Sequence, residues 1–298
     1  MSSSHPAIRH IVNPDGASRR TILKAGIGLA GLSLTGFSAT RVFAQESTPD
    51  AIATTCVLTP ELTEGPYYLD GQILRQDITE GKPGVPLALQ IAVQDTTDCS
   101  PLANAAVEIW HCDAQGYYSG VTGANPGGGA SEDDTTSTTF LRGIQLTDAD
   151  GIVTFNTIYP GWYSGRTVHI HMKVEVNGQI VDITEDPDAT ATDGETYEGE
   201  MTVHTGQLFF EDAITDEVLM TEAYARDSSQ GHITNDEDNI FGDHDDEPGF
   251  LVEIDGDVTS GFAGTITVGV DPTQEATEAG GGGGMGGPGA PGGPPPQG

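Results

Sequence analysis

The chain has 298 residues, and its 11 Lys and Arg residues against 45 Asp and Glu residues give a formal net charge of −34. An acidic surface of this strength repels phosphate backbones and anionic lipid, which argues against nucleic acid as a partner. The three cysteines, Cys56, Cys99 and Cys112, permit at most one intrachain disulfide, and the sequence leaves all three pairings open.

The first 44 residues have the pattern of a cleavable export signal. Arg19 and Arg20 precede an apolar stretch from Ala25 to Ala39, and Val42-Phe43-Ala44 provides a small-residue cleavage site. The apolar stretch is too short and too rich in Gly and Ser to span a bilayer as a stable helix. The paired arginines are typical of the twin-arginine route. We therefore expect a signal peptide over residues 1–44, export to the periplasm, cell surface or exterior, and no stable membrane span in the mature form.

Residues 45–272 are predicted to form one all-β domain. From Val85 to Val93, large apolar residues alternate with smaller or polar ones, which is the two-residue period of a half-buried strand. Further strands are expected over Ala106–Cys112, Gly151–Ile158, Val168–Val176, Gln207–Phe210, Phe250–Ile254 and Thr265–Val270, with one helix over Thr215–Ala225. Many short strands separated by Gly-, Asp- and Pro-rich turns predict a β-sandwich or barrel. Residues 273–298 are so rich in Gly and Pro that we expect a disordered tail.

A pair of histidines on one predicted strand suggests a metal site. His169 and His171 are two residues apart within Val168–Val176, so their side chains share one face while the apolar residues between them face the core. Two turns that contain tyrosine strengthen this prediction: residues 107–120 end in a glycine turn with Tyr117 and Tyr118, and residues 158–166 read IYPGWYSGR and end three residues before His169. Phenolates are hard oxygen ligands, and two of them with two imidazoles favour Fe(III) over Zn(II) or Cu(I). Because a phenol titrates near pH 10, only a strongly charged cation keeps it ionised at neutral pH.

Four segments carry a resemblance to a known family. They are TEGPYY (63–68), VEIWHCDAQGYYSG (107–120), TTFLRGIQLTDADGIVTFNTIYPGWYSGRTVHIHMKV (138–174) and HTGQLFF (204–210). In content, order and spacing they resemble the intradiol ring-cleavage dioxygenases, which include protocatechuate and catechol dioxygenases, over about residues 56–270. The resemblance implies a β-sandwich whose long loops carry the iron site.

The resemblance also assigns roles to single residues. It implies a non-haem Fe(III) held by Tyr118, Tyr163, His169 and His171, with Tyr163 also accepting a substrate proton. It implies that Arg166 and Gln207 act in catalysis, and that Gly65, Pro66 and Tyr67 line the substrate pocket. The implied partners are a catechol-type diol and O2, and the implied product is a cis,cis-muconate-type diacid. The particular catechol and the oligomeric state are left open.

Some residues in these segments have alternative interpretations. His111 is expected to be structural, although it adjoins Cys112. The acidic residues 235–238 and 243–247 lack the spacing of a calcium loop and are expected to form a solvated acidic loop. For the whole chain, the alternatives are a non-catalytic, secreted β-sandwich that binds carbohydrate or protein, and a copper or zinc β-sandwich.

Overall fold

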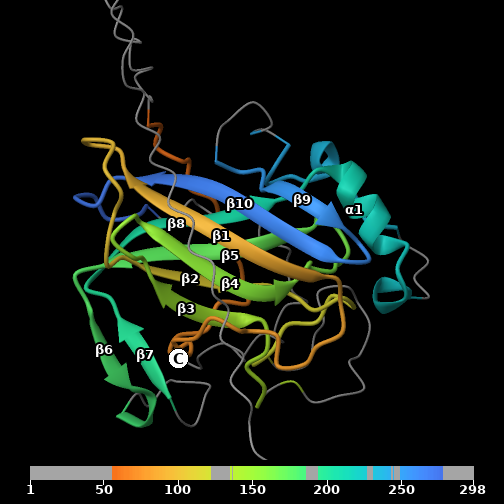
Figure 1. Ribbon diagram of the computed structural model, residues 1–298, viewed down its shortest axis with the longest axis horizontal. Coiled ribbons are helices and arrows are strands. Elements are labelled where there is room, and N and C mark those ends of the chain that lie inside the picture. Colours follow the sequence, from red (N-terminus) through yellow and green to blue (C-terminus); the bar gives the residue numbers. More distant parts are fainter. Residues whose placement is uncertain are drawn as a thin grey trace, which may run out of the picture. The chain divides into compact units, whose positions relative to one another are not determined.

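The computed structural model describes residues 56–121, 135, 137–185, 194–226, 231–242, 244 and 249–277 (Figure 1). The expected signal peptide and residues 278–298 of the expected disordered tail lie outside the described residues, whereas residues 273–277 of that tail are described, and the Ala276 N–H donates to the Thr202 carbonyl at 2.8 Å. Among the residues that are described, no helix is long and apolar enough to cross a membrane.

Two four-stranded sheets form a β-sandwich, which confirms the predicted fold class (Figure 1). The first sheet has the order β4 (Ile152–Ile158), β1 (Pro86–Asp95), β10 (Gly261–Val270) and β9 (Glu253–Asp257). The second has the order β3 (Arg142–Leu146), β2 (Ala106–Trp110), β5 (His169–Val176) and β8 (Met201–Phe209). A separate hairpin pairs β6 (Gln179–Asp182) with β7 (Glu195–Glu198). Neighbouring strands are antiparallel except β1 and β10, which run parallel.

The helical segments are short and lie in the connections. Helix α1 spans Asp212–Leu219, so it begins and ends earlier than predicted, and the 3-10 helix η2 (Glu222–Tyr224) follows it. Two further 3-10 helices are η1 (Ile183–Glu185) and η3 (Asn235–Glu237). Strands β3, β6 and β7 were not predicted. They are only four or five residues long and carry polar residues at sheet edges, so no alternating pattern develops in their sequences.

The apolar faces of the two sheets meet in one core. On β1, Leu87, Leu89 and Ile91 are at most 1% exposed, as the alternation predicted. They belong to the same buried cluster as Val107 and Ile109 of β2, together with the apolar residues of β5. Strand β5 is nevertheless buried on both faces, because loops cover the outer side of the second sheet. This covered outer face holds both histidines of the predicted metal site.

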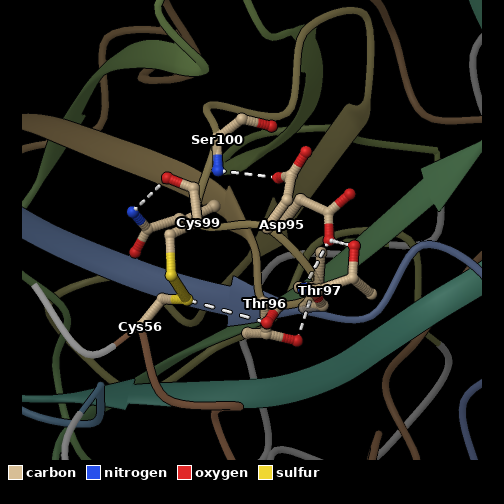
Figure 2. The surroundings of a disulfide bond; sticks show 9 residues. Cys56, Asp95, Thr96, Thr97, Cys99 and Ser100 are labelled. Carbon is tan, nitrogen blue, oxygen red and sulfur yellow. Dashed lines mark hydrogen bonds between the residues drawn. A yellow bond between two sulfur atoms is a disulfide. The ribbon is translucent and has the colours of Figure 1, made fainter.

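A disulfide between Cys56 and Cys99 selects one of the three possible pairings (Figure 2). Cys99 lies in the turn after β1, where the Asp95 carboxylate accepts a hydrogen bond from the Thr97 backbone N–H at 2.7 Å. The bond therefore attaches the chain around residue 56 to the end of β1. Cys112 is a buried free thiol.

Removing this disulfide is expected to destabilise the domain. The bond closes a loop with a sequence separation of 43 residues. Since such a cross-link restricts the unfolded chain, the Cys56→Ser/Cys99→Ser variant should lose about 2–4 kcal/mol of unfolding free energy. Urea denaturation of both proteins, with and without a reductant, measures the difference. Equal midpoints under oxidising conditions would contradict the expectation, and reductant should lower the midpoint of the unsubstituted protein only.

Candidate metal centre

Strand β5 places His169 and His171 side by side in the buried outer face of the second sheet. Their Nε2 atoms are 3.1 Å apart, and both residues are at most 2% exposed. The Nδ1–H of His169 donates to the Thr167 carbonyl at 2.7 Å, which leaves the Nε2 lone pair of His169 directed at its neighbour. Burial, and secondly the charge of Arg166, lower the pKa of both histidines well below the usual value. Both imidazoles are therefore neutral and can bind a metal at neutral pH.

The two tyrosines predicted as ligands reach the same point from separate turns. The Oη of Tyr163 lies 3.0 Å from the Nε2 of His169. The ring of Tyr118 lies 6.0 Å from that of Tyr163 and 6.2 Å from that of His171, measured between centroids. Tyr118 Oη is buried and has no hydrogen-bond partner in the described part of the chain. Burial raises the pKa of both phenols above the usual value of 10.

This arrangement fits a trivalent metal ion. Two imidazole lone pairs 3.1 Å apart repel one another unless a proton or a cation lies between them. A buried phenol oxygen without a partner costs free energy, and a bound cation removes that cost by ionising it. Within the described residues, no group of three or more His, Cys, Asp or Glu side chains could hold a metal. The donors available are thus two imidazoles and two phenols, a set whose hard oxygens suit Fe(III).

Close backbone contact between the two tyrosine-bearing turns sets the positions of the phenols. A Cβ at Gly116 would lie 2.4 Å from the Trp162 carbonyl oxygen, and one at Gly161 would lie 2.3 Å from that of Asp113. Gly116 also has a φ of +86°, which favours glycine. Arg226 links the same turns, since its Nη1 donates to the Gln115 carbonyl at 2.7 Å and its Nη2 to that of Trp162 at 2.6 Å. Sequence reasoning missed Arg226, because it lies far along the chain from both turns.

Arg166 and Gln207, the two further residues to which the resemblance gives a role, lie next to each other beside the histidines. Gln207 lies directly opposite His171 in the β5–β8 pair. Its Oε1 accepts a hydrogen bond from Arg166 Nη2 at 2.6 Å, and its Nε2 donates to the Thr63 carbonyl at 2.8 Å. The Nε of Arg166 forms a 2.8 Å ion pair with Asp238, whose side chain is fully buried.

The segment Gly65-Pro66-Tyr67 also lies against the predicted ligands. Gly65 has a φ of +79°, and a Cβ on it would come within 3.0 Å of the His171 ring. The ring of Tyr67 stacks on that of Tyr118 with centroids 4.7 Å apart. Pro66 connects these two contacts along the chain. The segment thus forms one wall of the centre.

Two expectations for nearby residues have different outcomes. His111 is structural, as expected, because its Nδ1 contacts the Cys112 carbonyl and its Nε2 contacts the Thr157 hydroxyl, each at 2.8 Å. The solvated acidic loop was wrong for Asp238 and Asn235, which are 1% and 6% exposed. Asp236 and Glu237 are exposed, and residues 243 and 245–247 lie outside the described residues. The sequence did not indicate that Asn235 and Asp238 are buried, because local composition does not show which side chains point into the protein.

A cavity of about 270 Å³ lies further along the same face of the second sheet. Four carboxylates line it, those of Asp70, Glu108, Glu175 and Glu198. Glu108 is 3% exposed, and its burial raises its pKa well above the usual value of 4.5. Nearby, Lys173 Nζ forms a 2.8 Å ion pair with Glu64, which does not line the cavity.

Glu108 should make the domain less stable as the pH rises. The folded state keeps the Glu108 proton at pH values above 4.5, where the unfolded chain has lost it. The unfolded state then binds fewer protons, so the unfolding free energy falls as pH rises, by at most about 1.4 kcal/mol per pH unit from this group. Glu108→Gln should therefore lose less stability than the unsubstituted protein between about pH 5 and pH 7. Urea denaturation at several pH values measures both slopes, and the exposed Glu198→Gln is the control. Parallel pH dependences for Glu108→Gln and the unsubstituted protein would refute this account.

Comparison with known proteins agrees with this centre. A family model described as Dioxygenase matches residues 60–180, a range that contains all four candidate ligands. Catechol 1,2-dioxygenase 1 of Acinetobacter lwoffii is 34% identical over 110 residues, which cover 35% of this chain and 32% of that protein. Chlorocatechol 1,2-dioxygenase of Pseudomonas sp. (strain P51) is 27% identical over 136 residues, covering 39% and 49%. The matches thus span half or less of these curated relatives.

A solved structure extends the similarity to about three quarters of this chain. An intradiol ring-cleavage dioxygenase from Tetranychus urticae superposes with a TM-score of 0.59 at 28% sequence identity. The match covers 74% of this chain and 98% of that one. The sandwich, the convergence of two histidines and two tyrosines, and these similarities together make the chain similar to the intradiol ring-cleavage dioxygenases in fold and in sequence.

Proposed function

We propose that the protein is an exported, non-haem Fe(III) dioxygenase that cleaves catechol-type diols between their two hydroxylated carbons. It uses O2 and forms cis,cis-muconate-type diacids. The proposal rests on one observation: Tyr163 Oη lies 3.0 Å from His169 Nε2, which in turn lies 3.1 Å from His171 Nε2. The buried Tyr118 Oη, which has no hydrogen-bond partner among the described residues, belongs to the same cluster of side chains. The named activities of the catechol and chlorocatechol relatives support the substrate class.

The four ligands have distinct tasks in this proposal. His169 and His171 supply neutral nitrogen donors, and the two phenols supply anionic oxygens once a trivalent cation has displaced their protons. When bound, Fe(III) would supply Lewis acidity that makes the diol hydroxyls more acidic and the ring reactive toward O2. Tyr163 then accepts one proton from the incoming diol at its Oη. If hydroxide accepts the second diol proton, both protons are accounted for and the charge at the centre changes little when substrate binds.

The groups around the ligands orient and stabilise the substrate. Arg166 is held by Asp238 and Gln207, so its fixed positive charge can stabilise negative charge that develops on the opening ring. Gly65, Pro66 and Tyr67 form the pocket wall, where the absence of a side chain at Gly65 leaves room beside His171.

Export and domain limits are part of the same proposal. The twin-arginine pattern and the apolar stretch within residues 1–44 support a cleaved signal peptide, and residues 45–272 form the catalytic domain. The Cys56–Cys99 disulfide is compatible with an oxidising compartment.

The visible spectrum of the iron-loaded protein, before and after anaerobic addition of catechol, tests the proposal. A tyrosinate-to-iron(III) band that shifts with catechol is expected. Subsequent addition of ¹⁸O2 should give a ring-opened diacid carrying both oxygen atoms, measured by mass spectrometry. A protein that stays colourless after iron loading and leaves catechol intact would overturn the proposal and favour a non-catalytic binding module.

A further inference from the structure

Asp238 is a buried carboxylate that organises the surroundings of the metal centre. Its Oδ2 accepts hydrogen bonds from Arg166 Nε at 2.8 Å and from the Thr167 backbone N–H at 2.7 Å. Its Oδ1 accepts from the backbone N–H groups of Ile240 and Phe241, at 2.7 and 3.1 Å. Each carboxylate oxygen is thus engaged twice, so the side chain cannot rotate without breaking four hydrogen bonds.

Two residues of one loop, Asn235 and Asp238, form hydrogen bonds with Thr167, which lies two residues before His169. Asn235 Oδ1 accepts a hydrogen bond from the Thr167 hydroxyl at 2.9 Å, and Asn235 Nδ2 donates to the Phe210 carbonyl at 2.8 Å. The Thr167 carbonyl in turn accepts the Nδ1–H of His169 at 2.7 Å. Asp238 and Asn235 therefore fix the peptide that orients one of the histidines.

Asp238 also determines how Arg166 presents its guanidinium. A guanidinium has five donors in a planar fork, and fixing two of its three nitrogens fixes the plane. Nε is bonded to Asp238 and Nη2 to Gln207 Oε1 at 2.6 Å. Neither hydrogen bond involves Nη1, so the position of Nη1 is set by the hydrogen bonds at Nε and Nη2. Arg166 is 17% exposed in its side chain, while Asp238 is fully buried beneath it.

We propose that Asp238 is a positioning residue, which fixes the guanidinium plane of Arg166 beside the metal centre. This inference rests on the proposed function for its catalytic consequence, although the orientation of Arg166 can be measured without catalysis. Asp238 touches neither the substrate nor the metal in this proposal. We expect its effect on the reaction to pass mainly through Arg166, because the hydrogen bond between Asn235 and Thr167 still holds the peptide that orients His169 when Asp238 is replaced.

The variant that tests the proposal is Asp238→Asn, with the neighbouring, exposed Asp236→Asn as a matched control. An amide has the shape of the carboxylate but one acceptor oxygen, so it cannot serve both Arg166 and the Ile240–Phe241 backbone. We expect kcat for catechol to fall by about 10- to 100-fold because the guanidinium is misplaced. KM and iron content should change by less than about threefold, and Asp236→Asn should match the unsubstituted enzyme.

A double-mutant cycle separates positioning from general loss of structure. In an Arg166→Met background the guanidinium is absent, so adding Asp238→Asn should cost less than about threefold more. An equal loss in both backgrounds, or full activity of Asp238→Asn, would overturn the proposal. If Asp238→Asn does not retain iron, Asp238→Glu is tested in the same cycle, because it keeps the charge and displaces the oxygens.

A second readout does not require turnover. Full-length protein loaded with diamagnetic Ga(III) should show a slowly exchanging Nε–H resonance of Arg166 by ¹⁵N NMR, assigned through Arg166→Lys. This resonance should be lost to exchange in Asp238→Asn and kept in Asp236→Asn. If the unsubstituted enzyme does not cleave catechol, the proposed function fails, while the NMR result still decides whether Asp238 orients Arg166. Retention of the protected resonance in Asp238→Asn would refute the positioning role.

Discussion

Replacing His171 with alanine should remove iron binding and, with it, the visible band and catechol cleavage. His171 supplies one of the two nitrogens that lie 3.1 Å apart, and its ring stacks on Trp110 with centroids 5.1 Å apart. Loss of groups that only orient metal ligands typically costs 10- to 100-fold in metal affinity, so loss of a ligand should cost more than about 100-fold. Iron content after dialysis, measured by mass spectrometry, and the visible spectrum give the result.

His111→Gln is the matched control for this experiment. His111 is as deeply buried as His171, but both of its ring nitrogens already contact protein oxygens at 2.8 Å. Its replacement should lower the thermal midpoint while leaving iron binding and colour in the folded protein. Stoichiometric iron in His171→Ala, or loss of iron in folded His111→Gln, would show that the ligands are wrongly assigned.

Replacing Arg166 with methionine should lower kcat while the protein keeps its iron. The guanidinium is the positive charge held beside the centre by Asp238 and Gln207. Removing one such preorganised donor typically costs about 10²–10³-fold in kcat. Because the four ligands are untouched, the tyrosinate band should persist. It should still shift when catechol is added without oxygen.

Arg166→Lys provides the graded comparison. Lysine keeps the charge but lacks the planar fork that engages Asp238 and Gln207 together. Its kcat should therefore lie between that of Arg166→Met and that of the unsubstituted enzyme. Stopped-flow measurement of ring opening in single turnovers separates the chemical step from product release. A loss of less than about threefold in Arg166→Met would remove Arg166 from the reaction.

Much of the centre could be predicted because its central elements are local in sequence. His169 and His171 share a face through the two-residue period of β5, and the apolar residues between them enter the core as expected. Tyr118 and Tyr163 were placed by the resemblance of their turns to a known family, and both are buried beside the histidines. Periodicity alone would not have selected them, since a tyrosine in a turn commonly packs without binding a metal.

The residues that were missed act across long stretches of chain. Asp238 lies in an acidic run, and it bonds to Arg166 at a separation of 72 residues. Arg226 joins the two tyrosine-bearing turns from separations of 111 and 64 residues. Neither contact leaves a local pattern, because each depends on how distant loops meet over the outer face of the second sheet.

The sequence by itself determined the all-β class, most strands of the core and the placement of His169 and His171 on one face of a strand. These follow from alternating burial and from the short range over which neighbouring side chains share a face. Only the tertiary structure decided that Cys56 pairs with Cys99, that Asp238 is buried and that Arg226 fastens the turns. Each of these depends on which distant backbones come into contact, and that is settled by the packing of the two sheets and their loops.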